Sequence, residues 1–128
     1  MCDMNEELKK YNELKRRVGA LEKLWEKDDD IERKKIIEKD IKKTKFEIDI
    51  IDTILNMLPI IERTIIECRY IHKYTWVKTC LIVGYSETQS REKMKKGIEQ
   101  LEVYKKSLIN FLGKYNENSF DDVSLIGV

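Results

Sequence analysis

The chain has 128 residues and carries 25 lysines and arginines against 24 aspartates and glutamates, a formal net charge of +1. Apolar residues make up 41% of the chain, which is enough for a packed core and argues against wholesale disorder. No stretch approaches the roughly 20 apolar residues that cross a bilayer, and the N-terminus lacks the pattern of a secretion signal. Three cysteines are too few for a disulfide scaffold. These features predict a cytoplasmic protein with no membrane partner.

The chain has only five glycines and one proline, and this scarcity predicts an all-α fold. The first helix is expected over about residues 5–27 and the second over about 31–57, with Asp30 as N-cap of the second. Their short connection predicts an antiparallel helical hairpin, coiled-coil-like, over residues 1–57. Apolar positions recur at helical spacing in both helices. They are Leu8, Tyr11, Leu14, Val18, Leu21 and Trp25, then Ile37, Ile41, Thr44, Ile48, Ile51, Leu55 and Leu58, with Ile36, Ile50, Ile54 and Met57 widening the second face.

Residues 58–113 have the pattern of a helix-turn-helix domain. Pro59 ends the second helix and can open a third, whose expected buried residues are Ile60, Ile61, Ile65, Ile66 and Tyr70. A short helix over 75–82 follows. Its inward residues are expected to be Trp76, Val77, Cys80 and Leu81.

A tight turn separates that short helix from a long one. Gly84 can adopt φ > 0 in the turn, Tyr85 is an apolar plug, and Ser86 is a good N-cap. The long helix is expected to run toward Leu112 and to stop at Gly113, which leaves residues 114–128 as a loosely ordered tail. Its inward residues are expected to be Met94, Ile98 and Leu101, with Gly97 beside them.

Polar side chains at the start of the long helix have the chemistry that reads base edges in a major groove. Arginine suits guanine, glutamine suits adenine, and glutamate can accept from cytosine N4, although solvated surface charge is an equally good interpretation of each glutamate. Lys73 and Lys78 flank the short helix, where phosphate contacts usually arise. The expected DNA-binding residues are Lys73, Thr75, Lys78, Ser86, Glu87, Thr88, Gln89, Arg91, Glu92 and Lys95.

The charge distribution independently favours this interpretation. Residues 58–114 hold 11 basic and 6 acidic side chains, a net charge of +5. Residues 1–57 hold 14 basic and 15 acidic side chains, a net charge of −1, and residues 115–128 hold three acids. The near-neutral total therefore hides a positive segment that suits a phosphate backbone.

The segment 58–101 resembles the C-terminal half of phage transcriptional regulators of the RinA/ArpU type and, more distantly, region 4 of bacterial sigma factors. The residues that carry the resemblance are Leu58-Pro59, Glu62-Arg63, Ile65-Ile66, Arg69-Tyr70, Trp76, Gly84-Tyr85-Ser86 and Arg91. It implies a nucleoid-associated regulator that binds specific double-stranded DNA, activates late phage genes and, by family analogy, contacts RNA polymerase. Ser90 and Gly97 depart from the sigma pattern, which has Val or Ile and Ala there, and are expected to loosen the helix packing.

The cysteines and the single histidine do not have the pattern of a metal site or of a catalytic centre. Cys68, His72 and Cys80 are spaced so that their side chains could bind one Zn²⁺ ion, but a structural site needs a fourth ligand and the sequence has none at a suitable spacing. A buried free cysteine and a surface histidine are therefore the favoured interpretation. No nucleophile accompanies the single histidine and no glycine-rich phosphate loop exists, so we expect no enzyme, no metal and no cofactor.

Two alternatives stay open. The chain could be a helical assembly or adaptor protein, of which a small terminase-like DNA-packaging subunit is a variant. The wide apolar face of the second helix suits either a purely intramolecular core or a homodimer, which would pair two reading helices on a two-half-site operator.

Overall fold

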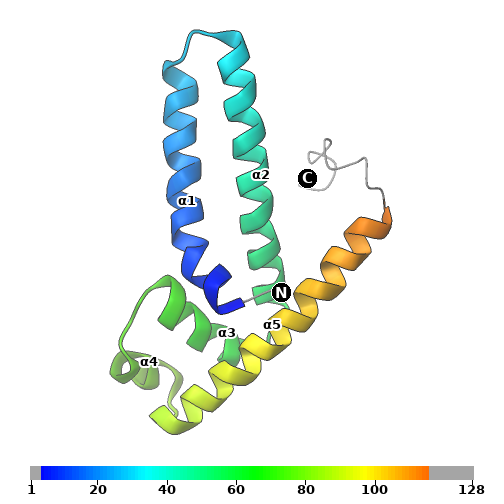
Figure 1. Ribbon diagram of the computed structural model, residues 1–128. Coiled ribbons are helices and arrows are strands. Elements are labelled where there is room, and N and C mark those ends of the chain that lie inside the picture. Colours follow the sequence, from blue (N-terminus) through cyan, green and yellow to red (C-terminus); the bar gives the residue numbers. More distant parts are fainter. Residues whose placement is uncertain (1–3, 116–128) are drawn as a thin grey trace.

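The computed structural model describes residues 4–115, which form an all-α protein of five α-helices and one π-helical segment (Figure 1). The all-α prediction is confirmed. Cys2 and the expected tail beyond Tyr115 lie outside the described residues. The elements are α1 (Met4–Lys27), α2 (Ile31–Asn56), α3 (Ile60–Ile66), the π-helix η1 (Glu67–Ile71), α4 (Trp76–Val83) and α5 (Glu87–Tyr115). None of the helices described is long and apolar enough to cross a membrane.

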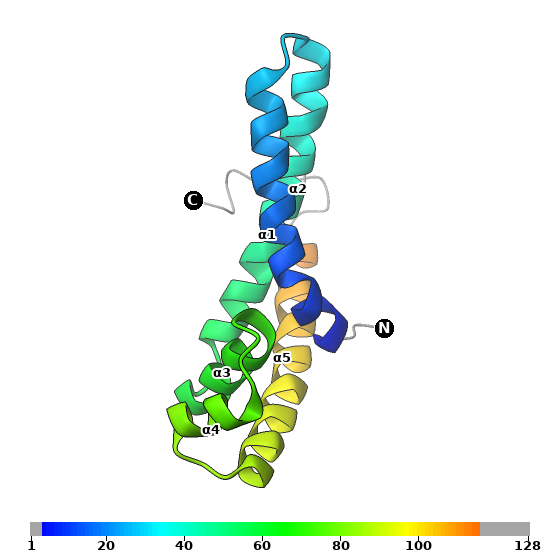
Figure 2. The ribbon, with the colours of Figure 1, turned by 90° about the vertical axis from the view of Figure 1, so that its left-hand side faces the viewer.

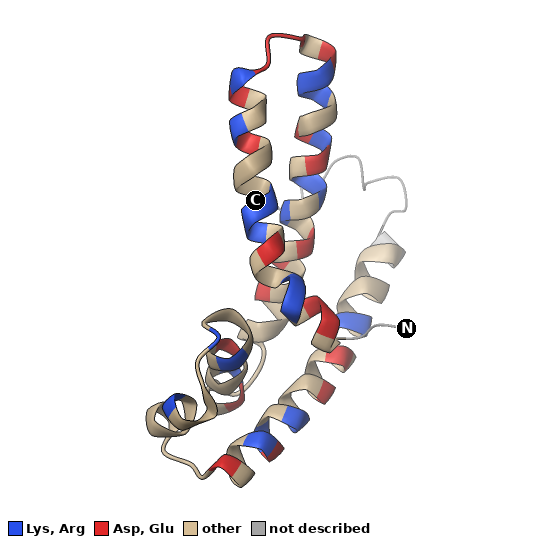
Figure 3. Ribbon diagram, turned by 60° about the vertical axis from the view of Figure 1, so that its left-hand side comes forward, with Lys and Arg blue, Asp and Glu red and all other residues tan. Residues whose placement is uncertain are grey.

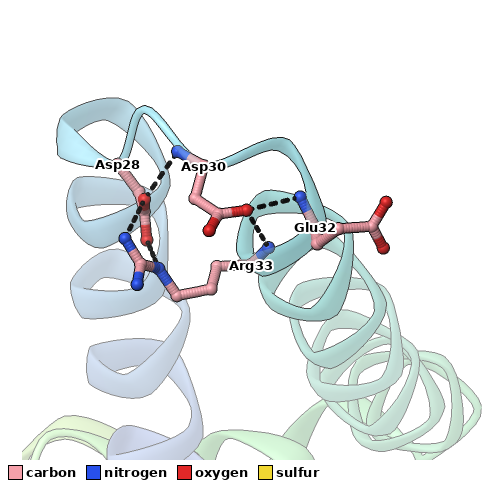
Figure 4. Close-up of polar contacts among 4 residues, drawn as sticks. All are labelled: Asp28, Asp30, Glu32 and Arg33. Carbon is pink, nitrogen blue, oxygen red and sulfur yellow. Dashed lines mark hydrogen bonds and ion pairs between the residues drawn. The ribbon is translucent and has the colours of Figure 1, made fainter.

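α1 and α2 lie antiparallel and extend away from the other helices, as Figures 1 and 2 show from two sides. Acidic residues organise their connection (Figure 4). The Asp30 carboxylate accepts hydrogen bonds from the backbone N–H of Glu32 at 2.9 Å and of Arg33 at 3.4 Å, which confirms the predicted N-cap. Asp28 accepts from the Arg33 guanidinium at 2.9 and 3.1 Å. Its hydrogen bonds from Arg33 and from the Asp30 backbone lower the pKa of the Asp28 carboxyl.

One hydrophobic cluster joins the hairpin to α3 and α5. It includes Leu8 and Tyr11 of α1, Ile54 of α2, Ile66 of α3 and Leu101 of α5. Most positions of the apolar stripes predicted for α1 and α2 lie in this cluster or pack against it: Leu8, Tyr11, Leu14 and Val18 of α1, and Ile41, Ile48, Ile51, Ile54 and Leu55 of α2. Hydrophobic burial across the two halves therefore fixes the foot of the hairpin on the C-terminal helices.

Three isoleucine and methionine predictions are wrong. Ile36 is 68%, Met57 51% and Ile60 60% exposed. Ile36 lies next to the half-buried Ile37, and Met57 next to the buried Leu58, so each points about 100° around the backbone away from its less exposed neighbour. Ile60 opens α3, while the buried face of that helix is formed by Ile65 and Ile66. The apolar face of α2 is therefore narrower than the sequence indicates.

α3 continues into the π-helical segment η1, which the sequence pattern did not predict. The His72 backbone N–H donates to the Glu67 carbonyl at 2.9 Å, an i to i+5 bond. The Tyr74 N–H then donates to the Cys68 carbonyl at 2.8 Å and closes the segment. This wider turn places Cys68 inside and brings the chain around toward α4.

α5 approaches α3 at Gly97. A Cβ at Gly97 would lie 2.9 Å from Ile66 Cδ1 and 3.2 Å from Glu62 Cβ. The expected close packing at Gly97 is confirmed, and the expected loosening there is wrong. Ser90, the other departure, is fully buried on the same side of α5, and the Cys80 thiol donates to its hydroxyl over 3.7 Å.

The C-terminal half of α5 leaves this contact and packs on the hairpin. Tyr104 and Leu108 are partly buried against the core, and Lys105 forms an ion pair with Glu7 of α1. The predicted stop at Gly113 is wrong by two residues, because the helix continues to Tyr115. A glycine in a helix costs only about 1 kcal/mol relative to alanine, so it does not by itself end one.

Candidate DNA-binding surface

The turn between α4 and α5 has the chemistry that the sequence predicts. Gly84 adopts φ 78° and ψ 20°, and its N–H donates to the Cys80 carbonyl at 2.8 Å. This left-handed conformation favours glycine because it has no Cβ. At the start of α5, the Ser86 hydroxyl accepts from the Gln89 N–H at 3.2 Å, while the Gln89 side-chain oxygen accepts from the Ser86 N–H at 3.3 Å. These reciprocal bonds form a capping box and confirm Ser86 as the N-cap.

α4 presents a different face inward from the one predicted. Thr79 is fully buried, whereas Val77 is 71% and Leu81 79% exposed. The prediction that Val77 and Leu81 face inward is therefore wrong. The Thr79 hydroxyl donates to the Thr75 carbonyl at 2.9 Å, which satisfies this polar group in the interior. Cys80 and Trp76 are half-buried beside it. Val77 and Leu81 lie four apart and form an apolar stripe on the outer side of α4.

The first turns of α5 separate into two faces. The inner face contains Ser90, Gly97, Ile98 and Leu101, all buried, with Met94 half-buried among them. The outer face contains the predicted base-reading residues, all exposed: Glu87, Thr88, Gln89, Arg91, Glu92 and Lys95. Figure 3, in which the ribbon is coloured by charge, marks both acidic and basic residues along this part of the helix. The outer face therefore offers donors and acceptors rather than a uniformly positive surface.

Arg91 is held in place on this face. Its Nε donates to the Glu87 carboxylate at 2.9 Å, and its guanidinium carbon lies 4.7 Å from the centre of the Trp76 ring. The Arg69 guanidinium lies 4.6 Å from the same ring and also donates to the Tyr74 carbonyl. The electron-rich indole face attracts both cations. Trp76 thereby links the end of the α3–η1 segment to the start of α5.

Gln89 is the predicted adenine reader, but its side-chain oxygen is occupied. That oxygen accepts from both the backbone N–H and the hydroxyl of Ser86. A bidentate contact with adenine needs the oxygen as acceptor and the amide nitrogen as donor. Gln89 would have to leave the capping box to make that contact.

The predicted phosphate contacts lie around the N-terminus of α4. Thr75 is the N-cap, and its hydroxyl accepts from the Lys78 N–H at 3.2 Å. The Lys78 ammonium lies 3.9 Å from the centre of the Tyr74 ring, and Lys73 is exposed with φ 56°. These residues form an exposed basic edge beside the start of α5.

A further contact between a cation and an aromatic ring, which the sequence did not predict, lies beside the turn. The Lys93 ammonium lies 4.8 Å from the centre of the Tyr85 ring and 3.9 Å from the Glu62 carboxylate. The contact of Lys93 with Glu62 joins residues far apart in the chain, as do the contacts of Arg69 and Arg91 with Trp76. Only the basic and aromatic composition of this segment could have indicated them.

The described cysteines and the histidine have separate surroundings. Cys68 is buried and free, and His72 is exposed and stacks on Tyr74 with ring centres 5.2 Å apart, as the favoured interpretation predicts. Burial, together with the charge of Glu67, raises the pKa of the Cys68 thiol. In residues 4–115, no three His, Cys, Asp or Glu side chains are grouped so that they could hold a metal ion.

Comparison of the chain with models of protein families, with curated proteins and with solved structures found no match.

Proposed function

We propose that this protein is a sequence-specific DNA-binding transcriptional regulator whose reading helix is the N-terminal part of α5. The observation that carries the proposal is the separation of faces: the inner residues of α5 are buried on α3 and α4, while six residues with base-reading chemistry are exposed. A helix supported on one side and exposed on the other can enter a major groove. Late-gene activation and contact with RNA polymerase follow from the family resemblance alone.

Arg91 is the residue we expect to contribute most to base recognition. Its contact with the Trp76 ring restricts the guanidinium before DNA arrives, so less side-chain freedom is lost on binding. Contact with a guanine edge requires Arg91 to leave or share Glu87, whose carboxylate can then accept from a neighbouring cytosine. Lys73 and Lys78 supply the phosphate contacts that set the orientation of the helix.

The test is binding of the full chain to double-stranded fragments from its own genetic locus, measured by fluorescence anisotropy at several salt concentrations. Arg91→Ala should weaken specific binding by about 1–3 kcal/mol, and Lys73→Ala should weaken binding to all sequences and lower the salt slope by about 1. Lys35→Ala removes the same charge from an exposed position on α2 and should leave specificity unchanged. Full affinity in an Arg91→Ala/Lys95→Ala double variant would refute the assignment of the reading helix.

The apolar outer stripe of α4 favours a second candidate, a helical assembly or packaging protein. Val77, Leu81 and Ile82, which is 50% exposed, form an apolar surface adjoining the proposed DNA-binding face. Such surfaces are typical of protein contacts. Mass measurement in solution separates the two: a ring of many subunits that Leu81→Lys breaks up favours assembly, while a monomer or dimer with salt-sensitive DNA affinity favours regulation.

A further inference from the structure

A groove of about 860 Å³ lies between the hairpin and the C-terminal half of α5, away from the proposed DNA-binding surface. Its apolar lining comes from all three helices: Leu14 of α1, Phe46, Ile50 and Ile51 of α2, and Ile109 of α5. Figure 1 shows that α5 diverges from α2 toward the C-terminal end of α5. The volume is in the range of pockets that enclose a drug-sized molecule or a few side chains.

The rim of the groove is positively charged. Five lysines line it, Lys10, Lys39, Lys42, Lys43 and Lys105, against two glutamates, Glu7 and Glu47. The lining therefore has a formal charge of +3. Lys105 is already paired with Glu7, which leaves the α2 lysines as the main positive group. An apolar floor with a basic rim fits a ligand that is both apolar and acidic.

The last 13 residues of the chain, 116–128, have that composition. They contain three acids, Glu117, Asp121 and Asp122, and no basic residue, so their formal side-chain charge is −3. They also contain Phe120, Val123, Leu125 and Ile126, which interleave with or follow the acids. The charge and the apolar content of this segment complement those of the groove.

The segment is also long enough and begins near the groove. α5 ends at Tyr115, six residues beyond the groove residue Ile109, a rise of about 9 Å at 1.5 Å per residue. The α2 wall from Lys39 to Ile51 is about 18 Å long by the same measure. Thirteen extended residues reach about 43 Å, so the segment can turn back and follow the whole wall.

We infer that the C-terminal segment 116–128 of the same chain binds in this groove, with its apolar side chains on the floor and its acids against the α2 lysines. The bound segment ties the end of α5 to the hairpin and covers the apolar floor. The inference is independent of the proposed DNA-binding function, because neither the groove nor the segment includes a residue assigned to that surface.

Zero-length carbodiimide cross-linking of the full chain tests this inference, because it joins a carboxylate to an amine only where they are in contact. We expect links from Asp121 or Asp122 to Lys42 or Lys43, identified by mass spectrometry. A 1:1 mixture of isotopically light and heavy protein should give only light–light and heavy–heavy links. The link between Lys45 and Glu22, whose charged atoms lie 3.6 Å apart, serves as internal standard.

Charge reversal sharpens the test. D121K/D122K removes the carboxylates and K42E/K43E the amines that these links consume, so each variant alone should lose them. The combined variant exchanges acid and base, and links between positions 121 or 122 and positions 42 or 43 should return in it; their absence there would overturn the inference. F120S/I126S should lower the yield while leaving the charges unchanged. Mixed light–heavy links would overturn the inference in favour of a second copy in the groove. Links spread evenly over lysines outside the groove would overturn it as well.

Discussion

The substitution Gly97→Ala introduces one methyl group where α5 meets α3. The new Cβ would lie 2.9 Å from Ile66 Cδ1 and 3.2 Å from Glu62 Cβ, both closer than ordinary contact. Ile66 is fully buried and has little room to withdraw, while Cβ of Glu62 is tied to the α3 backbone. Overpacking of this kind costs about 1–3 kcal/mol. Alanine recovers about 1 kcal/mol of helix propensity, so the net loss is about 0–2 kcal/mol.

Gly19 supplies the matched control. It lies inside α1, and a Cβ there would meet nothing within 4 Å. Gly19→Ala should therefore stabilise the protein by about 0.5–1 kcal/mol. We expect urea unfolding, followed by circular dichroism, to separate the two variants by about 1–3 kcal/mol. Gly97→Ala that stabilises as much as Gly19→Ala would refute the close approach of α5 and α3.

Three further predictions follow from single residues. Gly84→Ala should destabilise the protein by about 1–2 kcal/mol, because the φ of 78° at this position is unfavourable for a residue with a Cβ. Gly84→Asn should destabilise it less, since asparagine tolerates the left-handed conformation. Equal losses of stability in the two variants would contradict this reasoning. Burial and the hydrogen bond to Asp52 raise the pKa of the Tyr11 hydroxyl above its ordinary value of 10.0. The free energy of unfolding should therefore fall as the pH rises past about 10. Urea titrations at alkaline pH should show a weaker dependence of this free energy on pH in Tyr11→Phe. Iodoacetamide should modify Cys80 before the buried Cys68 in peptide mapping, since burial and raised pKa both slow Cys68; the reverse order would contradict its placement.

The hairpin could be predicted because its signal is long and periodic. The heptad of α2 runs over three repeats, and each of its last five positions, from Thr44 to Leu58, is buried. The capping residue Asp30 and the turn residue Gly84 were predictable for a different reason, since each performs a local backbone task that few residue types can perform.

The inner face of α4 could not be predicted from its sequence. Its eight residues are almost all apolar, so no periodic pattern distinguishes one side from the other. Burial instead selects Thr79, whose hydroxyl is satisfied locally by the Thr75 carbonyl. Likewise, the exposed position of Arg91 followed from helical spacing, but its contact with Trp76 depends on how three separate elements meet. The groove beside α5 depends on tertiary packing in the same way.

α5 runs without interruption from the exposed side chains at Glu87 to the hairpin contact at Leu108 and beyond. Because successive residues in a helix turn by about 100°, the angle between the proposed DNA-binding side of α5 and its hairpin-facing side depends on the number of residues between them. Inserting one residue after Gln100 would rotate one face about the helix axis by about 100°, whereas inserting seven would nearly restore the phase. The direction in which the hairpin extends from the proposed DNA-binding surface is thus set by the number of residues in one helix.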